Sequence, residues 1–400
     1  MAGVTTSTLG SLLKRVYSRR LVQQQNKAAF LYKMLPKSIY TPKGTGFYAA
    51  VSVTGNQQGG GAINESEALK TAGYETVEQF VITPKINEWT INITGLARAV
   101  SEGDEASFAK GLVRQLDEAL ENMIKDVNRQ CYGNGLGTLA VVNGTQTGTT
   151  ITFDDVIYLK PGMVVDTYDS TGTTRDENSV TISSVDRTNN QATFSTSISV
   201  TDNDIVVREE TLVSAASDGK EIAGTKRIID DGTVATSFQG LSRTTYPILK
   251  GNIIAAGSVN LTNDLLQRAV DEVSIVGDGK IDMLIMRQGQ RRKYLDLTTP
   301  DKRFLDDKLD RGYQYLYWNG MKMYIDVDCT KGEIIGLTQK YLERFEVRGI
   351  HLADDDGSIL KWNGTADVFV AYYRLYANLG SLKPNAHFRL TGLNEPTGSN

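Results

Sequence analysis

The chain has 400 residues, of which 40% are hydrophobic and 22% are charged, and its formal net charge is −4. This composition is that of an ordinary globular protein, long enough to bury a substantial core and to form two or three structural units. No apolar run approaches the ~20 residues of a membrane-spanning helix, and the opening segment MAGVTTSTLG lacks the charged and apolar regions of a secretion signal. We therefore expect a soluble protein that is made in the cytosol and has no membrane partner.

The first segment of the chain is basic, and the rest is acidic. Residues 1–64 contain eight of the 43 Lys and Arg residues and none of the 47 Asp and Glu residues. Apolar positions between residues 6 and 35 have a sparse helical spacing, and Pro36 ends any helix there. Such an arm can bind the acidic body of a neighbouring copy, which is our first interpretation, or a scaffold or nucleic acid, or it can be a solvated helix face. The basic residues expected to make the contact are Lys14, Arg15, Arg19 and Arg20.

Three stretches with strand composition follow, at residues 46–53, 75–83 and 86–93. A glycine-rich stretch separates the first two, which predicts a long hairpin with a flexible tip. At ~3.3 Å per residue, an arm of ~15 residues projects roughly 50 Å, farther than is needed to cover its own domain. We therefore expect the hairpin to contact another subunit. The residues expected at that contact are Gly55, Gln57, Gln58 and Gly61.

A long periodic run begins near Ser101 and ends at Gly133. Apolar residues recur at three- and four-residue spacings from Phe108 to Cys131, which predicts an amphipathic helix. About 30 residues at ~1.5 Å each make a rod of roughly 45 Å. The polar face carries mixed charges, which indicate water or a polar contact between subunits. The residues proposed for such a contact are Arg114 and Glu118.

Residues 145–212 are rich in Thr, Ser, Asp and Val, and they contain short strand-like pieces between turn residues. Because no helical pattern intervenes, we predict a small β-barrel or sandwich inserted into the larger fold. Residues 213–257 show no clear pattern and are expected to be irregular.

The C-terminal half alternates helices and strands. The pattern predicts a helix closed by Gly277, a buried strand through residues 281–286 and a further helix through Arg291. The pair Asn319-Gly320 between strand-like flanks predicts a type I′ hairpin. Long strands continue to about residue 380, so we expect a mixed α+β body.

The sequence lacks the common patterns of catalytic and metal sites. Neither His351 nor His387 has a Cys or a second His nearby, and neither HExxH nor GxSxG occurs. The stretch from Gly133 to Gly137 follows a helix, so we interpret it as a cap and turn and not as a nucleotide loop. The triplet Asp354 to Asp356 lacks the spacing of a calcium loop and fits a hairpin turn. We expect no catalytic, cofactor-binding or metal-binding residues and no enzymatic activity.

Four segments give the sequence a family resemblance. They are INEWTINITGLARA (86–99), NRQCYGNGLGTLA (128–140), GMKMYIDVD (320–328) and FVAYYRLYANLGSLKPNAHFRLTGL (369–393). In this order, and together with the arm, the hairpin and the long helix, they resemble the major capsid proteins of tailed bacteriophages, which share the Hong Kong phage capsid fold. The resemblance covers the chain apart from residues 145–212.

The resemblance implies an α+β fold of the Hong Kong phage type with an inserted small β-barrel-like domain. The arm and hairpin would lap over adjacent subunits, and an axial domain would surround the centres of the capsomers. The units it implies are an N-terminal arm (1–37), an extended loop hairpin (38–95), a peripheral domain with the spine helix (96–144), the inserted β domain (145–212), an axial domain (213–339), peripheral strands (340–375) and an axial return with the C-terminal tail (376–400).

The function implied by the resemblance is that of a major capsid protein, which self-assembles into the icosahedral head shell around the genome. The expected partners are other copies in hexameric and pentameric capsomers, a separate scaffolding protein, a portal protein and packaged DNA in weak nonspecific contact. We expect the protein in the virion shell, after assembly in the bacterial cytoplasm. The alternatives are an encapsulin-like compartment shell and, less favoured, a polysaccharide-active enzyme with a β accessory module or a surface-layer protein.

Part of the family links its subunits covalently through a lysine of the extended loop. The sequence here has no lysine between Lys43 and Lys70. We therefore expect a shell that is held together by noncovalent contacts.

Overall fold

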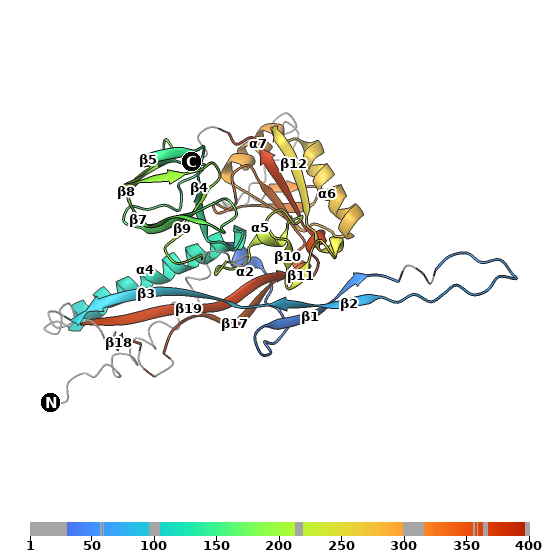
Figure 1. Cartoon of the computed structure of the whole chain (residues 1–400), viewed down its shortest axis with the longest axis horizontal. Coiled ribbons are helices and arrows are strands. Elements are labelled where there is room, and N and C mark those ends of the chain that lie inside the picture. The colour runs from blue at the N-terminus through green and yellow to red at the C-terminus, as the bar shows by residue number, and fades with distance from the viewer. Residues whose placement is uncertain are drawn as a thin grey trace, which may run out of the picture.

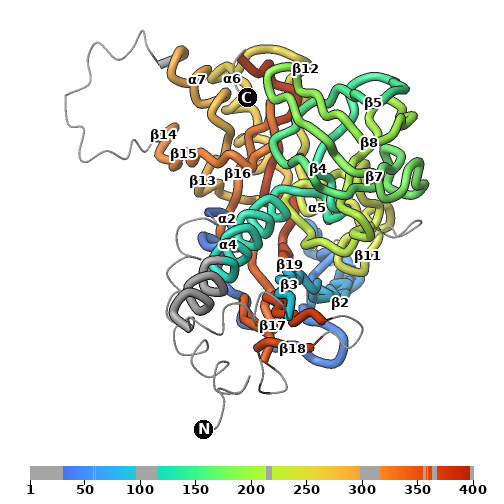
Figure 2. Tube along the Cα trace, turned by 90° about the vertical axis from the view of Figure 1, so that its left-hand side faces the viewer, coloured from blue at the N-terminus to red at the C-terminus, as the bar shows by residue number. Residues whose placement is uncertain are grey.

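The computed structural model of the chain describes residues 30–56, 58, 60–95, 105–212, 219–298, 316–354, 357, 359–362 and 367–396, with the backbone alone for 105–114 and 298. A long sheet and a helix form the base of the molecule, and a two-stranded ribbon extends from this base away from the body (Figure 1). A mixed sheet with two helices and a small barrel stand side by side above the base (Figure 2).

The base is built around α4 (Glu105–Tyr132), the long helix that the sequence predicts. Its buried side chains recur every three or four residues along the part whose side chains are described, from Leu116 to Cys131. They pack on a four-stranded antiparallel sheet in which the central strand is flanked on both sides. The strands are β3 (Lys85–Thr94), β17 (Leu342–Leu352), β18 (Lys361–Trp362) and the central β19 (Val368–Ser381).

A short helix, α2 (Phe30–Met34), belongs to the core of this base. Leu31 and Leu35 are fully buried, and the Leu31 N–H donates to the Asn128 Oδ1 on α4 over 3.1 Å. The sequence predicts an arm over residues 1–37, and its last part is corrected here. These residues are core because their apolar side chains pack against α4.

The ribbon consists of β1 (Phe47–Thr54) and β2 (Thr76–Ile82), paired antiparallel. β2 leads directly into β3, so the ribbon continues the line of the base sheet (Figure 1). The described residues between Thr54 and Thr76 form the far end of the ribbon. The hairpin that the sequence predicts is therefore present.

The axial unit is a six-stranded mixed sheet. Its core strand β13 (Met283–Met286) is buried on both faces, with Leu284 and Met286 toward the two helices and Met283 and Ile285 toward the base. The strands in spatial order are β12 (Asn252–Val259), β20 (Phe388–Leu393), β16 (Ile334–Leu337), β13 (Met283–Met286), β15 (Met321–Ile325) and β14 (Leu316–Trp318), and the helices are α6 (Asn263–Gly277) and α7 (Gln288–Thr298).

The tight turn predicted at Asn319-Gly320 joins β14 to β15. Both residues have positive φ, 46° and 78°, which a type I′ turn requires. The predicted helix end is also confirmed, since Asp278 caps α6 in the left-handed conformation directly after Gly277.

The barrel has six strands and a core of its own, which includes Phe153 and Phe194. An isolated bridge between Val142 and Phe153 joins the ends of the first and last strands, so the sheet closes on itself. The strands in spatial order are β4 (Thr138–Val141), β9 (Ile205–Arg208), β6 (Val164–Tyr168), β7 (Arg175–Asp186), β8 (Gln191–Val200) and β5 (Gln146–Thr152).

Two domain boundaries differ from the sequence prediction. The inserted unit begins at β4 and not at residue 145, because β4 pairs with β9. β19 stays in the base sheet through Ser381, where it still pairs with β17, so the return to the axial sheet comes later than residue 376. The crossing is made by the 3₁₀ helix η4 (Pro384–Ala386), which leads into β20, and the reverse crossing by η3 (Gln339–Tyr341), which leads into β17.

The region predicted to be irregular, residues 213–257, consists of short elements where it is described. They are α5 (Thr225–Ile228), β10 (Ser237–Phe238), β11 (Leu241–Ser242) and the 3₁₀ helix η1 (Pro247–Leu249). Its last residues are an exception, because β12 begins at Asn252 and pairs in parallel with β20.

Candidate assembly surface

The ribbon is longer than its paired strands. Phe47 pairs with Ile82 at the root and Thr54 with Thr76 at the end of the ladder. Beyond the ladder the two arms stay close, since a Cβ built on Gly73 would clash with the Asn56 Oδ1. A side chain at position 73 would therefore have to displace the Asn56 side chain.

The turn at the far end of the ribbon runs from Asn64 to Glu67. The Glu67 N–H donates to the Asn64 carbonyl over 3.1 Å. The Glu67 carboxylate in turn accepts from the backbone N–H and the Nδ2 of Asn64, at 2.9 and 3.2 Å. These side-chain hydrogen bonds close the turn. The described residues between Gly55 and Gly61 therefore lie along one arm, whereas the sequence predicts them at the tip.

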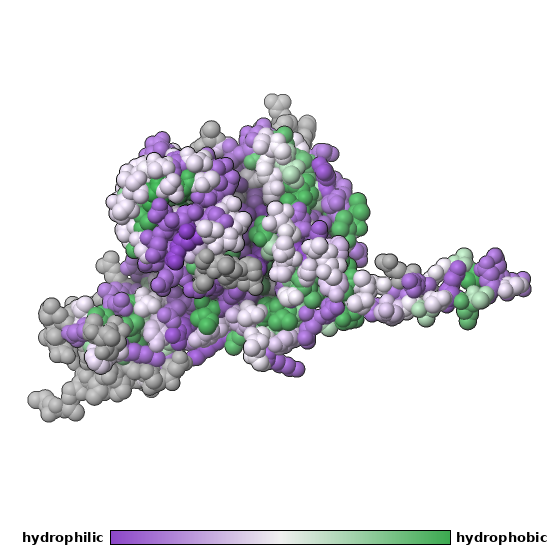
Figure 3. Space-filling view, in the orientation of Figure 1, coloured by the Kyte–Doolittle hydropathy of each residue, from purple (hydrophilic) through white to green (hydrophobic). Residues whose placement is uncertain are grey.

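Large apolar side chains on the ribbon face solvent. Leu69 and Tyr74 are each 86% exposed, Val77 is 58% exposed and Ile63 is 47% exposed. Figure 3 shows hydrophobic patches among polar atoms on the extension. A two-stranded ribbon has no second layer to cover such side chains. These four residues are called the ribbon apolar set below.

The root of the ribbon is fixed to the body. Phe47 and Ile82 pack with Phe345 of β17, and the two phenyl rings lie 5.4 Å apart, edge to face. The Tyr246 hydroxyl donates to the Glu78 carboxylate over 2.7 Å. These contacts set the direction in which the ribbon leaves the base.

The structure places part of the predicted contact set. Gly55, Gln58 and Gly61 are exposed on the ribbon, and Glu118 is exposed on α4. Arg114 lies in α4, but its side chain is outside the described part. The other predicted residues lie outside the described residues altogether, namely Lys14, Arg15, Arg19, Arg20 and Gln57.

Lys70 changes one expectation drawn from the sequence. It lies in the connection between β1 and β2, where its Cε is 3.5 Å from a Cβ built on Gly61 across the ribbon. The extended loop therefore does carry a lysine. The absence of one between Lys43 and Lys70 no longer argues for a noncovalent shell.

The barrel is tied to the rest of the molecule by polar contacts. The Asp155 carboxylate accepts from Arg287 of the axial unit at 2.6 Å, and the Tyr158 hydroxyl donates to Asp328 at 2.9 Å. On the other side, Arg208 of β9 donates to Asp126 of α4 at 2.8 Å. The barrel thus has polar contacts with both the base and the axial sheet.

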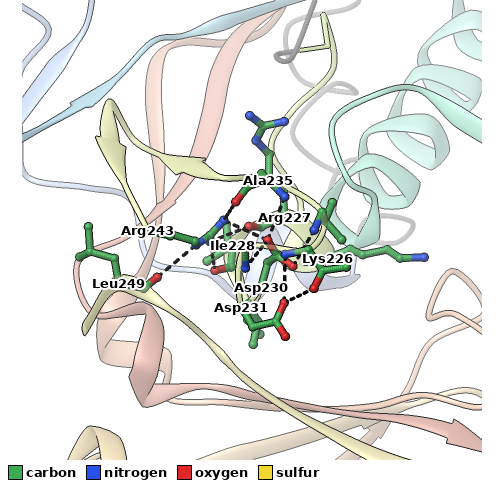
Figure 4. A network of polar contacts seen from close by, with 12 residues as sticks. Lys226, Arg227, Ile228, Asp230, Asp231, Ala235, Arg243 and Leu249 are labelled. Carbon is green, nitrogen blue, oxygen red and sulfur yellow. Dashed lines mark hydrogen bonds and ion pairs between the residues drawn. The ribbon is translucent and has the colours of Figure 1, made fainter. Parts of the chain in front are cut away.

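Arg243 organises the segment between the barrel and the axial sheet (Figure 4). The side chain is fully buried, and its five N–H groups are all used. One N–H donates to the equally buried Asp230 at 3.2 Å. Burial lowers the pKa of the Arg243 guanidinium to about 10. The other four bond to the carbonyls of Arg227, Ile228, Ala235 and Leu249 at 2.8 to 3.2 Å.

Within the described residues, no helix is long and apolar enough to span a membrane. The same part of the chain contains no cluster of three or more His, Cys, Asp or Glu side chains arranged to hold a metal ion. Cys131 and Cys329 are buried and form no disulfide.

Comparison with known proteins bears on the fold. No protein-family model matches the sequence, and no curated protein sequence matches it. The cyanophage A-1(L) capsid subunit superimposes with a TM-score of 0.56 over 92% of this chain and 93% of that chain, at 10% sequence identity. The chain has the Hong Kong phage capsid fold.

Other solved structures are similar to a lesser degree. The capsid of the native GTA particle matches with a TM-score of 0.48, at 10% identity over 90% of this chain and 88% of that one. The SrpI encapsulin from Synechococcus elongatus PCC 7942 matches with a TM-score of 0.46, at 9% identity over 91% and 87% of the two chains. These two scores are too low to bear on function.

With this fold, α4 is the spine helix, its sheet the peripheral domain, the ribbon the extended loop and the six-stranded sheet the axial domain. Sequence reasoning located the ribbon but not the exposed apolar side chains on it. Leu69 and Tyr74 are isolated apolar residues in a polar, glycine-rich stretch, and that contrast was the available signal. Nothing local in the sequence indicated the role of Arg243.

Proposed function

We propose that this chain is the major capsid protein of a tailed bacteriophage, and that its copies assemble into the icosahedral head shell that encloses the genome. The observation that carries the proposal is the ribbon apolar set. It lies on an extension that is fixed at its root and projects away from its own body (Figure 1). The capsid fold supports the same interpretation.

The energetic argument concerns where these side chains become buried. Fully burying a Leu or a residue of similar size stabilises by about 1.5–3 kcal/mol, and the isolated ribbon gains none of this at Leu69 or Tyr74. If a neighbouring copy covers them, each subunit gives one ribbon and receives one. Repeated contacts of this head-to-tail kind form closed rings when the rotation between copies closes.

The remaining partners follow from the same proposal. The basic arm, with Lys14, Arg15, Arg19 and Arg20, would bind acidic surface on an adjacent copy or on a separate scaffolding protein. Hexameric and pentameric capsomers would form the shell, with a portal protein at one vertex. Packaged DNA would touch the inner surface weakly, and the protein would reside in the virion after assembly in the host cytoplasm.

We also propose that the protein has no enzymatic role. The buried Arg243 side chain holds the fold together through Asp230 and four carbonyls. A shell subunit needs geometry and adhesive surfaces, and both are present in the ribbon and its anchored root.

Electron microscopy tests the proposal directly. The full chain is expressed alone and together with a candidate scaffolding protein from the same genome, and the particles are imaged. We expect hollow isometric shells with sixfold and fivefold capsomers. A monodisperse species of 43.9 kDa under every condition would contradict the proposal.

The encapsulin-like alternative is separated by what the particles contain. A phage head requires neighbouring genes for a portal and a terminase, and the native particles should hold DNA. If a neighbouring gene encodes a cargo enzyme and native particles hold that enzyme in place of DNA, the protein is an encapsulin-like shell. The assignment as a shell subunit would then stand, and the assignment to a phage would not.

A further inference from the structure

A groove opens where the base, the barrel and the axial unit meet. Its volume is about 510 Å³, a size typical of pockets that bind ligands. All three units contribute apolar side chains to its lining, and each of these side chains is only partly buried. The apolar residues are Phe30, Trp89, Ile157, Tyr158, Ile325 and Val327. Because covering such side chains stabilises a protein, the groove is suited to binding a further segment.

Two carboxylates lie on the wall of the groove, directly after β15. The Asn128 Nδ2 donates to both of them, at 3.0 Å to Asp326 and 2.6 Å to Asp328. The Tyr132 hydroxyl also donates to Asp326 over 2.8 Å, and the Tyr158 hydroxyl donates to Asp328 over 2.9 Å. Because hydrogen bonds from such donors favour the ionised form of a carboxylate, the wall carries two negative charges at neutral pH.

The cations that line the groove on α4 and β9 are paired with other acids. Within the described part of the chain, neither Asp326 nor Asp328 forms an ion pair. The pairs that the neighbouring cations form are Arg129 with Asp126 and Glu221, Arg208 with Asp126, and Lys125 with Glu121. The two carboxylates therefore offer a partner to a basic side chain that enters the groove.

The described part of the chain begins in this groove. Phe30 lines it, and the Leu31 N–H donates over 3.1 Å to Asn128, the same side chain that donates to both carboxylates. Lys27 comes three residues before Phe30, so the Cα atoms of these two residues are at most roughly 10 Å apart. Lys27 is also the only charged residue between Arg20 and Phe30. A basic side chain is therefore tethered beside the two carboxylates.

We propose that residues 25–29, which precede the described part of the chain, occupy this groove, with the Lys27 ammonium paired with Asp328. Asp328 is the more exposed of the two carboxylates, so a side chain from the groove can reach it. Charge complementarity and the apolar lining favour this segment, which contains one lysine, two alanines and no acid. Because the segment is tethered at Phe30, its effective concentration at the groove is on the order of millimolar, which favours it over any separate peptide.

The docked segment would fix the point from which the basic arm leaves the body. The arm would then extend from the junction of the three units, with its remaining basic residues free to reach a neighbouring surface. The docking concerns the subunit itself and holds whether or not the proposed shell function is correct. The competing explanation is that Lys160, an exposed residue on the barrel side of the same groove, turns toward Asp328 instead.

Hydrogen exchange of the full chain at low protein concentration tests the docking. The amides of residues 25–29 should exchange several-fold more slowly than in a free peptide of the same sequence. Lys27→Gln and Asp328→Asn should each remove most of this protection. Because both substitutions break the same ion pair, the double variant should lose no more protection than either single variant.

Lys160→Gln is the matched control, because it removes the same charge from the barrel side of the groove and should leave the protection of residues 25–29 unchanged. If Asp328→Asn does not fold, the comparison of Lys27→Gln with Lys160→Gln still decides. An equal loss in Lys160→Gln, free-peptide exchange in the unmodified chain, or additive losses in the double variant would overturn the docking. Protection that appears only as the protein concentration is raised would also overturn it, since the occupant would then be the arm of a second copy.

Discussion

The backbone N–H of Thr338 donates a hydrogen bond to the Nδ1 of His387 over 3.1 Å. Since Nδ1 accepts, the ring proton is on Nε2, which donates to the Oγ of Ser381 at 3.1 Å. His387 is fully buried, and burial lowers its pKa from 6.5 to about 3. The imidazole is therefore a neutral bridge between the axial sheet and the end of β19.

This bridge predicts a loss of stability in acid. The unfolded chain takes up a proton at His387 below pH 6.5, while the folded chain does not until about pH 3. Across that window the free energy of unfolding should fall by up to about 1.4 kcal/mol per pH unit because of this one group. Urea denaturation of the full chain at a series of pH values measures the slope.

Two variants separate titration from hydrogen bonding. His387→Gln removes the titrating ring, so its stability should depend less on pH between 6.5 and 3. Ser381→Ala removes the partner of Nε2 and should lower stability by a similar amount at every pH. A pH profile of His387→Gln that is as steep as that of the unmodified chain would contradict the assignment.

Arg243→Lys should be among the most destabilising conservative changes in the chain. Lysine keeps the charge, but it has three N–H groups and no planar fork, so at least two of the five acceptors around position 243 lose their donor. Since each buried acceptor left without a donor costs about 1–3 kcal/mol, we expect a loss of at least about 2 kcal/mol. Urea denaturation measures the loss in the free energy of unfolding. The control is Arg268→Lys, at an exposed site on α6. An equal loss in that variant would show that the buried hydrogen bonds are not the cause.

Leu69→Ser combined with Tyr74→Ser should block shell formation without unfolding the subunit. Both side chains are 86% exposed, so subunit stability should change by less than about 0.5 kcal/mol. Sedimentation and electron microscopy would report the loss of particles. Glu65→Gln with Glu75→Gln changes exposed polar residues of the same ribbon and should leave assembly much less affected.

Neutralising Arg15, Arg19 and Arg20 to Gln should impair shell closure while the subunit stays folded. The physical reason is lost attraction between the basic arm and an acidic neighbour, an effect that added salt should imitate. The attraction is measured as particle yield at increasing salt concentration, for the unmodified chain and for the arm variant. The control variant removes three positive charges from exposed residues of the barrel, Lys160, Arg175 and Arg187. Normal particles from the arm variant would refute the role of the arm.

Several elements could be predicted from the sequence because their causes are local. The spacing of apolar residues predicted α4, since a helical period is visible within the segment itself. The pair Asn319-Gly320 predicted its turn, since the required positive φ values favour these two residue types. The barrel was predicted from closely spaced strands, although its first strand was assigned to the preceding unit.

The tertiary structure decided the features that depend on distant partners. Asn128 lies 198 residues before Asp326 and 200 before Asp328, and no local pattern indicates that the three side chains meet. Likewise, the helix at Phe30–Met34 is core and not a free arm only because α4 covers it.

The ribbon combines features that follow from the local sequence with features that depend on the tertiary structure. The sequence by itself determined that a long hairpin leaves the base, because strand composition and glycines are local signals. The structure decided that the turn is closed by Asn64 and Glu67 and that Leu69 and Tyr74 remain exposed. Exposure is a property of the whole fold, since a side chain stays in solvent when no other segment is placed to cover it.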